Sequence, residues 1–191
     1  LLMDNKVIQT IKDRRSIRAY KKDQLVPQET IEILKECALY SPTAQNKQEW
    51  HFSFIENPTL ILEMEEYIVS EILKNANDAI KERMASINNK VVYDAPLLVV
   101  ISVDRETLGY YGKLDAGIAA QNLCLAAESL GLNSVMLGMV APLFKGDKSD
   151  HWKTIVKMPE THDFAIAVAI GYGAMEGIKK ELDYSKISVV K

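Results

Sequence analysis

The most basic stretch of the sequence lies near its beginning and could bind an anion. Three arginines and a serine occur within five residues, Arg14-Arg15-Ser16-Ile17-Arg18. Guanidinium groups match the oxygens of a phosphate with charge-assisted, bidentate hydrogen bonds, each contributing about 1.5–3 kcal/mol. Runs of like charge are also typical of solvated surfaces. Taken alone, this segment therefore indicates either a phosphate site or a solvated basic stretch.

A second group of polar side chains forms the segment Ser41-Pro42-Thr43-Ala44-Gln45-Asn46-Lys47-Gln48-Glu49-Trp50. Small residues allow the backbone to approach a flat ligand, and amide side chains such as Asn46 both donate and accept hydrogen bonds. The same residue types suit an ordinary turn between a helix and a strand. Both interpretations stay open for this segment on its own.

A third segment, from Asp115 to Gly138, is rich in small residues. Its first part has the pattern of a long helix, and we interpret the alanines there as close packing in the core. Gly138 follows a short apolar stretch that ends at Leu137. A glycine at the end of a strand is a place where the backbone can approach a ligand.

Periodicity and turn residues place these segments on the elements of a mixed fold. Helices are expected from an Asp4 cap to about 13, from Pro27 to the Ser41-Pro42 stop, twice within 58–89 with a break near 75–77, at 112–130 and at 148–156; strands are expected at 50–55, 97–103, 134–138 and 164–170. The tail is polar and then mildly β-prone at 187–190. No glycine-rich phosphate fingerprint follows a strand, so the sequence predicts an α+β fold in one domain, 1–191, and not a Rossmann sheet.

Composition excludes several classes of protein. The chain has 23 basic and 26 acidic residues and a net charge of -3, which argues against a nucleic-acid partner. The apolar stretch 95–101 is too short to span a bilayer, and no signal-peptide pattern is present, so we expect a cytoplasmic location without a membrane partner. Cys37 and Cys124 are expected to be buried thiols. The histidines lack metal-ligand spacing, so no metal is expected.

Five sequence blocks together resemble the nitroreductase family. They are Arg-Arg-Ser-x-Arg from residue 14, Ser-Pro-Thr-Ala-x-Asn-x-Gln-x-Trp from residue 41, Asp-Ala-Pro at 94–96, Asp-x-Gly-x-Ala-x-Gln-Asn from residue 115 running into Gly-Leu at 131, and Ala-x-Ala-Ile-Gly-Tyr-Gly ending at 173. The blocks occur in family order and cover about residues 7–180. Two positions depart from the family, since Glu49 and Gly173 stand where proline is common.

The resemblance implies a nitroreductase-like α+β fold with a central, mainly antiparallel sheet flanked by helices, in an intertwined homodimer with two FMN sites at the interface. It implies that the ribityl phosphate and pyrimidine edge of one FMN are held by Arg14, Arg15, Ser16 and Arg18. Further contacts implied are Pro42, Thr43, Ala44 and Asn46 from the other subunit, Leu137 and Gly138 near the ring, Asn88 at the amide edge, and Lys179 or Lys180 at the phosphate.

The activity that the resemblance implies is an FMN-dependent oxidoreductase with NADH or NADPH as electron donor. Nitroaromatics, quinones or related small-molecule oxidants would be reduced in a ping-pong scheme, with the chemistry carried by flavin N5 and with no catalytic side chain. One alternative is an ene-reductase, dehalogenase or flavin-transforming enzyme of the same fold. Another is a non-catalytic flavin-binding or redox-sensing protein. A nucleic-acid-binding role for residues 14–22 is disfavoured by the net charge and by the few aromatic residues nearby.

Overall fold

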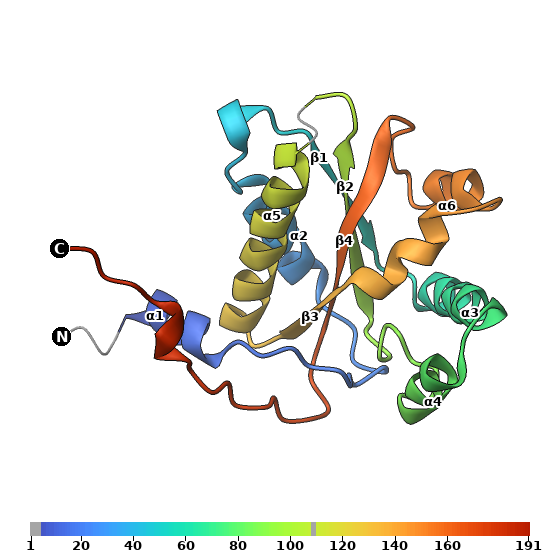
Figure 1. Ribbon diagram of the computed structural model, residues 1–191, viewed down its shortest axis with the longest axis horizontal. Helices are drawn as coiled ribbons and strands as arrows, with labels where there is room; N and C mark the ends of the chain where they lie inside the picture. Colours follow the sequence, from blue (N-terminus) through green and yellow to red (C-terminus); the bar gives the residue numbers. More distant parts are fainter. Residues whose placement is uncertain (1–4, 108–109) are drawn as a thin grey trace.

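A four-stranded sheet forms the centre of the protein, whose computed structural model describes residues 5–107 and 110–191. The strands lie in the order β1-β2-β4-β3 and comprise β1 (Trp50–Ile55), β2 (Leu97–Asp104), β3 (Asn133–Leu137) and β4 (His162–Gly171) (Figure 1). Every pair of neighbouring strands is antiparallel. The sheet and its helices confirm the predicted α+β class.

Helices cover both faces of this sheet, as Figure 1 shows. One face is covered by α2 (Gln28–Leu39) and α5 (Tyr110–Ser129), and the other by α3 (Pro58–Lys74), α4 (Asp78–Ser86) and α6 (Ser149–Ile155). The first helix, α1 (Lys6–Asp13), contacts α5. Three short 3-10 segments complete the fold: η1 (Ala44–Asn46), η2 (Gly138–Phe144) and η3 (Tyr184–Lys186). No helix of the described residues is both long and apolar enough to cross a membrane.

Strand β2 is buried on both faces, as its uninterrupted apolar run predicted. Alternate side chains of a strand point to opposite faces. Leu98 and Val100 accordingly pack with the side chains of α3, and Val99 and Ile101 with those of α2 and α5. Because β2 has apolar side chains on both faces, helices must cover both sides of the sheet to keep them from water.

Small residues bring α5 close to the sheet. Ala116, Ala119 and Ala120 are fully buried against the strands. The opposite side of the same helix is not covered within this chain, because Leu114 and Ile118 are 49% and 42% exposed. The small-residue pattern was interpreted correctly as core packing.

Asparagines begin three of the helices. Asn5 caps α1, and its Oδ1 accepts hydrogen bonds from the backbone N–H groups two and three residues later. Asn57 caps α3 in the same way, and Asn77 caps α4 by accepting one hydrogen bond, from the N–H three residues later. The expected break near 75–77 is confirmed. The expected cap Asp4 lies outside the described residues, and the observed cap is Asn5, the next residue in the chain.

The expectation that Cys37 is buried is wrong. Cys37 is only half-buried, because its side of α2 faces a depression of about 570 Å³ between α1 and α5 and not the sheet; Cys124 is buried as expected. The β-prone residues 187–190 form no strand in the part of the chain that the structure describes, and they are exposed. β-propensity alone produces a strand only where a neighbouring strand offers hydrogen-bond partners.

Alanine at Gly171 is expected to destabilise the protein. A Cβ there would lie 2.5 Å from Cδ of Pro96, whose ring cannot rotate away. The resulting shift should cost about 1–3 kcal/mol and lower the melting temperature measured by circular dichroism. Gly117→Ala is the control, since its Cβ meets nothing within 4 Å in this chain and alanine favours helix by about 1 kcal/mol. Equal melting temperatures for Gly171→Ala and the unmodified protein would contradict the close approach.

Candidate functional site

The basic segment, residues 14–18, runs along the beginning of β3. Ser16 forms a parallel bridge with Ser134, and the N–H of Ile17 donates to the Ser134 carbonyl oxygen at 3.1 Å. Ile17 is buried, whereas Ser16 and the two arginines before it are half-buried and Arg18 is exposed. One apolar side chain thus fixes the backbone while the basic groups stay accessible.

Tyr20 holds the far end of this segment. Its hydroxyl donates to the Ala169 carbonyl oxygen at 3.3 Å, and its N–H donates to the Tyr93 carbonyl oxygen at 3.1 Å. Burial raises the pKa of Tyr20, so the hydroxyl stays protonated and remains a donor. Asn88 lies in the same loop as Tyr93, on an exposed turn with φ of 51°. The structure therefore connects the basic segment to the loop that carries this predicted contact.

The arginine side chains of the basic segment have hydrogen-bond donors to spare. Arg15 Nη1 donates to the Arg14 carbonyl oxygen at 2.8 Å, and Arg18 Nη1 is 3.5 Å from the Ser16 carbonyl oxygen. Among the described residues, no ion pair involves any of the three guanidinium groups. A dianionic phosphate would supply the acceptors that these groups lack. The segment fits the phosphate of FMN on this ground.

Leu137 ends the strand that the basic segment follows, and Gly138 is the next residue. Leu137 is buried at the end of β3, and Gly138 is exposed at the start of η2. A Cβ built on Gly138 meets nothing within 4 Å, so the backbone there borders open space. The structure thus puts these two residues at the end of β3, the strand that Ser16 of the basic segment bridges at Ser134.

The tail after β4 returns to the basic segment. The N–H of Ala174 donates to the Ala19 carbonyl oxygen at 2.8 Å, and a Cβ on Gly177 would lie 2.4 Å from Cβ of Arg15. Lys179 and Lys180 follow within three residues, and both are exposed. The tail runs back toward α1 in Figure 1. Lys179 and Lys180 therefore lie on a segment that passes beside the arginines.

The second predicted part of the site, the 41–49 loop, is held by α5. Asn122 Nδ2 donates to Oγ of Ser41 at 3.0 Å, and the N–H of Ala44 donates to Oδ2 of Asp115 at 2.9 Å. Pro42 and Asn46 are exposed, and Thr43 and Ala44 are half-buried. Asn46 adopts a left-handed backbone with φ of 53°. Side-chain contacts with α5, and not packing in a core, give the loop its place.

Within one protomer, Ala44 of this loop and the basic segment lie near opposite ends of α5. The loop contacts Asp115 near the beginning of the helix, whereas Arg14 and Arg15 act electrostatically on Glu128 near its end. At 1.5 Å per residue, about 20 Å of helix separates these two carboxylates. The structure therefore brings the basic segment, Leu137–Gly138 and the tail together, and it places residues 42–46 elsewhere in the same chain.

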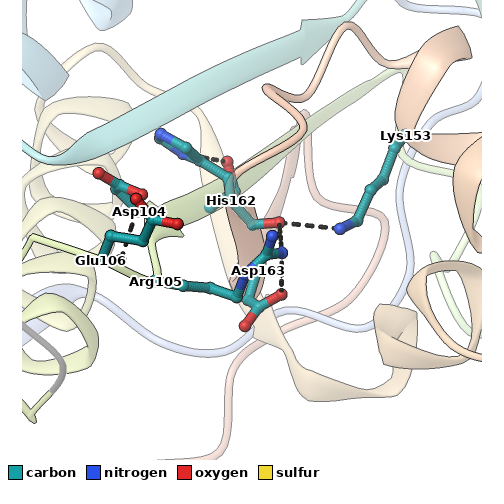
Figure 2. Close-up of polar contacts among 7 residues, drawn as sticks. Asp104, Arg105, Glu106, Lys153, His162 and Asp163 are labelled. Atoms are coloured by element: carbon teal, nitrogen blue, oxygen red, sulfur yellow. Dashed lines mark hydrogen bonds and ion pairs between the residues drawn. The ribbon is translucent and has the colours of Figure 1, made fainter.

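A second polar cluster joins the ends of β2 and β4 and is shown in Figure 2. Lys153 Nζ donates to the His162 carbonyl oxygen at 2.9 Å, Arg105 pairs with Asp163 at 3.1 Å, and His162 Nδ1 lies 3.1 Å from Oγ of Ser102. A serine beside a histidine suggests nucleophilic catalysis. Ser102 is only 1% exposed, however, so no substrate reaches it. Burial lowers the pKa of His162, and we interpret the cluster as a structural link between strands and α6.

Sequence reasoning missed Asp115 and Glu49. Asp115 was assigned to the packed helix, and Glu49 was noted only as a departure from the family pattern, yet both carboxyl groups are 5% exposed beside the 41–49 loop. The available signal was an aspartate on the alanine-rich, buried side of a helix. Within residues 5–107 and 110–191, no group of three or more His, Cys, Asp or Glu side chains could hold a metal ion.

The chain is similar to curated proteins of two archaea. A protein of Methanothermobacter thermautotrophicus named as a candidate NADH dehydrogenase/NAD(P)H nitroreductase is 29% identical over 190 residues, which is 97% of this chain and 87% of that protein. A protein of the same name from Archaeoglobus fulgidus is 29% identical over 166 residues, covering 86% and 84% of the two chains.

Solved structures show the same fold. A nitroreductase of Desulfitobacterium hafniense with bound FMN aligns with a TM-score of 0.92 and 26% identity over 98% of this chain and 99% of that one. A nitroreductase of Bacteroides fragilis, also with bound FMN, aligns with a TM-score of 0.88 and 28% identity over 98% and 100%. The sequence model of the Nitroreductase family matches residues 11–172 of this chain. On that match, this chain belongs to the nitroreductase family.

Proposed function

We propose that this protein is an FMN-dependent NAD(P)H oxidoreductase that reduces nitroaromatics, quinones or related small electrophilic acceptors in a ping-pong scheme. Two structural relatives carry FMN, and the archaeal relatives are named for NADH or NAD(P)H. The observation that carries the proposal is the group of three guanidiniums along β3, none of which forms an ion pair among the described residues. We treat residues 1–191 as one FMN-binding domain in a cytoplasmic enzyme.

Arg14, Arg15 and Arg18 would hold the phosphate and the pyrimidine edge of FMN, and Ser16 would add a hydroxyl donor. Each charge-assisted hydrogen bond contributes about 1.5–3 kcal/mol. The same positive charge has a second effect, because a cation about 4 Å from the N1 position of a reduced flavin interacts by up to about 4 kcal/mol at an effective dielectric constant near 20. Half-exposed groups contribute less than this limit, but the sign favours the reduced form.

Bound FMN would supply the chemistry itself, accepting hydride from NADH or NADPH and passing electrons to the acceptor. The protein's own residues bind and orient. Leu137 and Gly138 border the proposed ring position, and Lys179 or Lys180 extends the positive charge at the phosphate. Asn88 and Asn46 offer amide groups that both donate and accept, which suits the heteroatoms of the ring edge.

A homodimer is the second part of the proposal, because residues 42–46 would reach the flavin of the other subunit. The protomer exposes apolar side chains on the side of α1 and α5, as shown by Val7 and Ile11 at 66% and 53% exposed and by Leu114 and Ile118. Several exposed apolar side chains on two contacting helices are typical of an interaction site. A second copy would cover it and bring the 41–49 loop of one chain to the arginines of the other.

Reduction by a nicotinamide separates this function from that of a flavin-binding sensor. We expect freshly purified protein to show the visible spectrum of flavin, and anaerobic NADH or NADPH to bleach it rapidly. Re-oxidation by an added quinone or nitroaromatic should then follow a ping-pong pattern. A bound flavin that neither nicotinamide reduces would contradict the oxidoreductase proposal and favour the sensor. If only an enone or a halogenated acceptor re-oxidises the reduced flavin, the protein is an ene-reductase or a dehalogenase of the same fold.

Removing an arginine of the basic segment should weaken FMN binding without unfolding the protein. Loss of one charge-assisted contact predicts a roughly 10- to 150-fold rise in Kd for Arg14→Ala or Arg18→Ala, measured by fluorescence titration of FMN-free protein. Arg105→Ala is the matched control, because it removes an exposed guanidinium that pairs with Asp163 at another part of the molecule. Unchanged affinity in both basic-segment variants would disprove the phosphate assignment.

Dimerisation and FMN binding should be thermodynamically linked, since a shared site exists only in the dimer. We expect a dimer by light scattering and a melting temperature that rises when FMN is added. Ile118→Asp should produce monomers with much weaker FMN binding, because it places a charge on the exposed side of α5. Leu62→Asp changes a comparably exposed leucine on α3 and should stay dimeric. A monomer that binds FMN as tightly as the dimer would rule out a shared site.

A further inference from the structure

Two buried carboxyl groups meet where the 41–49 loop joins α5. Glu49 and Asp115 are each 5% exposed, Glu49 ends the loop whose Ala44 N–H bonds to Asp115, and the Asp115 carboxyl acts on the Glu49 carboxyl by hydrogen bonding and by charge. Both carboxylate oxygens of Glu49 are buried without a hydrogen-bond donor among the described residues. Asp115 uses Oδ2 to accept the N–H of Ala44 at 2.9 Å. Such a pair is unfavourable when both groups are charged, because like charges repel strongly away from water.

No cation of the described residues neutralises this pair. Neither carboxyl group takes part in an ion pair, and the nearby lysines in sequence, Lys47 and Lys113, are exposed. From β2, the N–H of Asp104 donates to the main-chain oxygen of Glu49 at 3.0 Å. The Asp104 carboxylate instead accepts hydrogen bonds from the side chain of Thr107 and the backbone N–H of Glu106. The charge that faces Glu49 is therefore that of Asp115.

We propose that Glu49 and Asp115 share one proton, and that this acid pair positions the 41–49 loop against α5. The shared proton turns repulsion into a carboxyl–carboxylate hydrogen bond, with Asp115 also holding Ala44. Both are positioning residues, since neither is placed against the flavin. The consequence for FMN rests on the function proposed above, in which the loop contacts the cofactor of the other subunit.

Loss of the shared proton should release the loop as pH rises. Burial raises the pKa of the Glu49 carboxyl above its ordinary value of 4.5, and the Asp115 carboxyl raises it further. An acid whose pKa is raised in the folded protein stabilises the fold at low pH, and that contribution is lost as pH rises from the ordinary value through the raised one. The docking constant of the loop falls about tenfold for each pH unit of that window.

Titration of Glu49 tests the shared proton directly. In full-length protein with ¹³C-labelled glutamate, the signal that disappears in Glu49→Gln identifies this carboxyl group. We expect it to titrate well above the exposed glutamates. Titration at the ordinary value would overturn the proposal.

Hydrogen exchange tests the effect on the loop. In FMN-free protein, protection of the Ala44 amide, corrected for the intrinsic exchange rate, should fall between about pH 5 and about pH 9, by about tenfold for each pH unit that lies below the raised pKa of Glu49. Glu49→Gln keeps a donor toward Asp115 and has no charge to titrate, so its protection should stay flat. Glu65→Gln is the control: Glu65 is equally buried and accepts the N–H of Val92 at 2.7 Å, far along the chain from the loop. It should keep the pH profile of the unmodified protein. Identical profiles in Glu49→Gln and the unmodified protein would refute the pairing.

The two proposals fail in different ways. Protein that shows the raised Glu49 titration and the pH-dependent loop but binds no FMN would contradict the proposed function alone. Protein whose FMN affinity and Ala44 protection are both independent of pH would contradict the acid pair alone. We expect FMN affinity to weaken as pH rises in the unmodified protein, and to do so less in Glu49→Gln.

Discussion

The close packing of α5 on the sheet determines where every part of the candidate site lies. Ala116, Ala119 and Ala120 leave no side-chain bulk between helix and strands, so the helix axis is held firmly relative to β4. The beginning of α5 then carries the 41–49 loop on its polar side chains. The other end turns at Gly131, with φ of 78°, directly into β3, which carries the basic segment. A larger residue at the alanines would move both halves at once.

The two halves differ in the kind of interaction that they offer. The basic segment presents guanidinium donors beside a fixed backbone, which suits the strong and geometrically tolerant recognition of a phosphate. The loop presents small residues, amides and backbone groups, which suit a planar ring and contribute less energy for each contact. In the proposed enzyme, affinity for the cofactor would depend mainly on the first half and the electronic properties of its ring on the second.

Local sequence patterns were sufficient to predict most of the sheet but little of what lies between elements. The run at 97–103 predicted a strand buried on both faces, because apolar side chains occupy both sets of alternating positions and would otherwise face water. The basic segment was found from residue type alone. In contrast, the half-burial of Cys37 depends on how α1 and α2 pack, and periodicity describes one helix at a time. The pairing of Glu49 with Asp115 joins positions far apart in the chain, and nothing local to either residue indicates it.

The return of the tail to the basic segment has a consequence for synthesis of the chain. Residues 14–18 leave the ribosome before the residues that hold them, because Ser16 and Ile17 bond to Ser134, and Ala19 accepts a hydrogen bond from Ala174. Contacts this distant in sequence form slowly, because a long loop must close before they are made. The proposed anion-binding surface is therefore complete only after Ser134 and Ala174 have been synthesised.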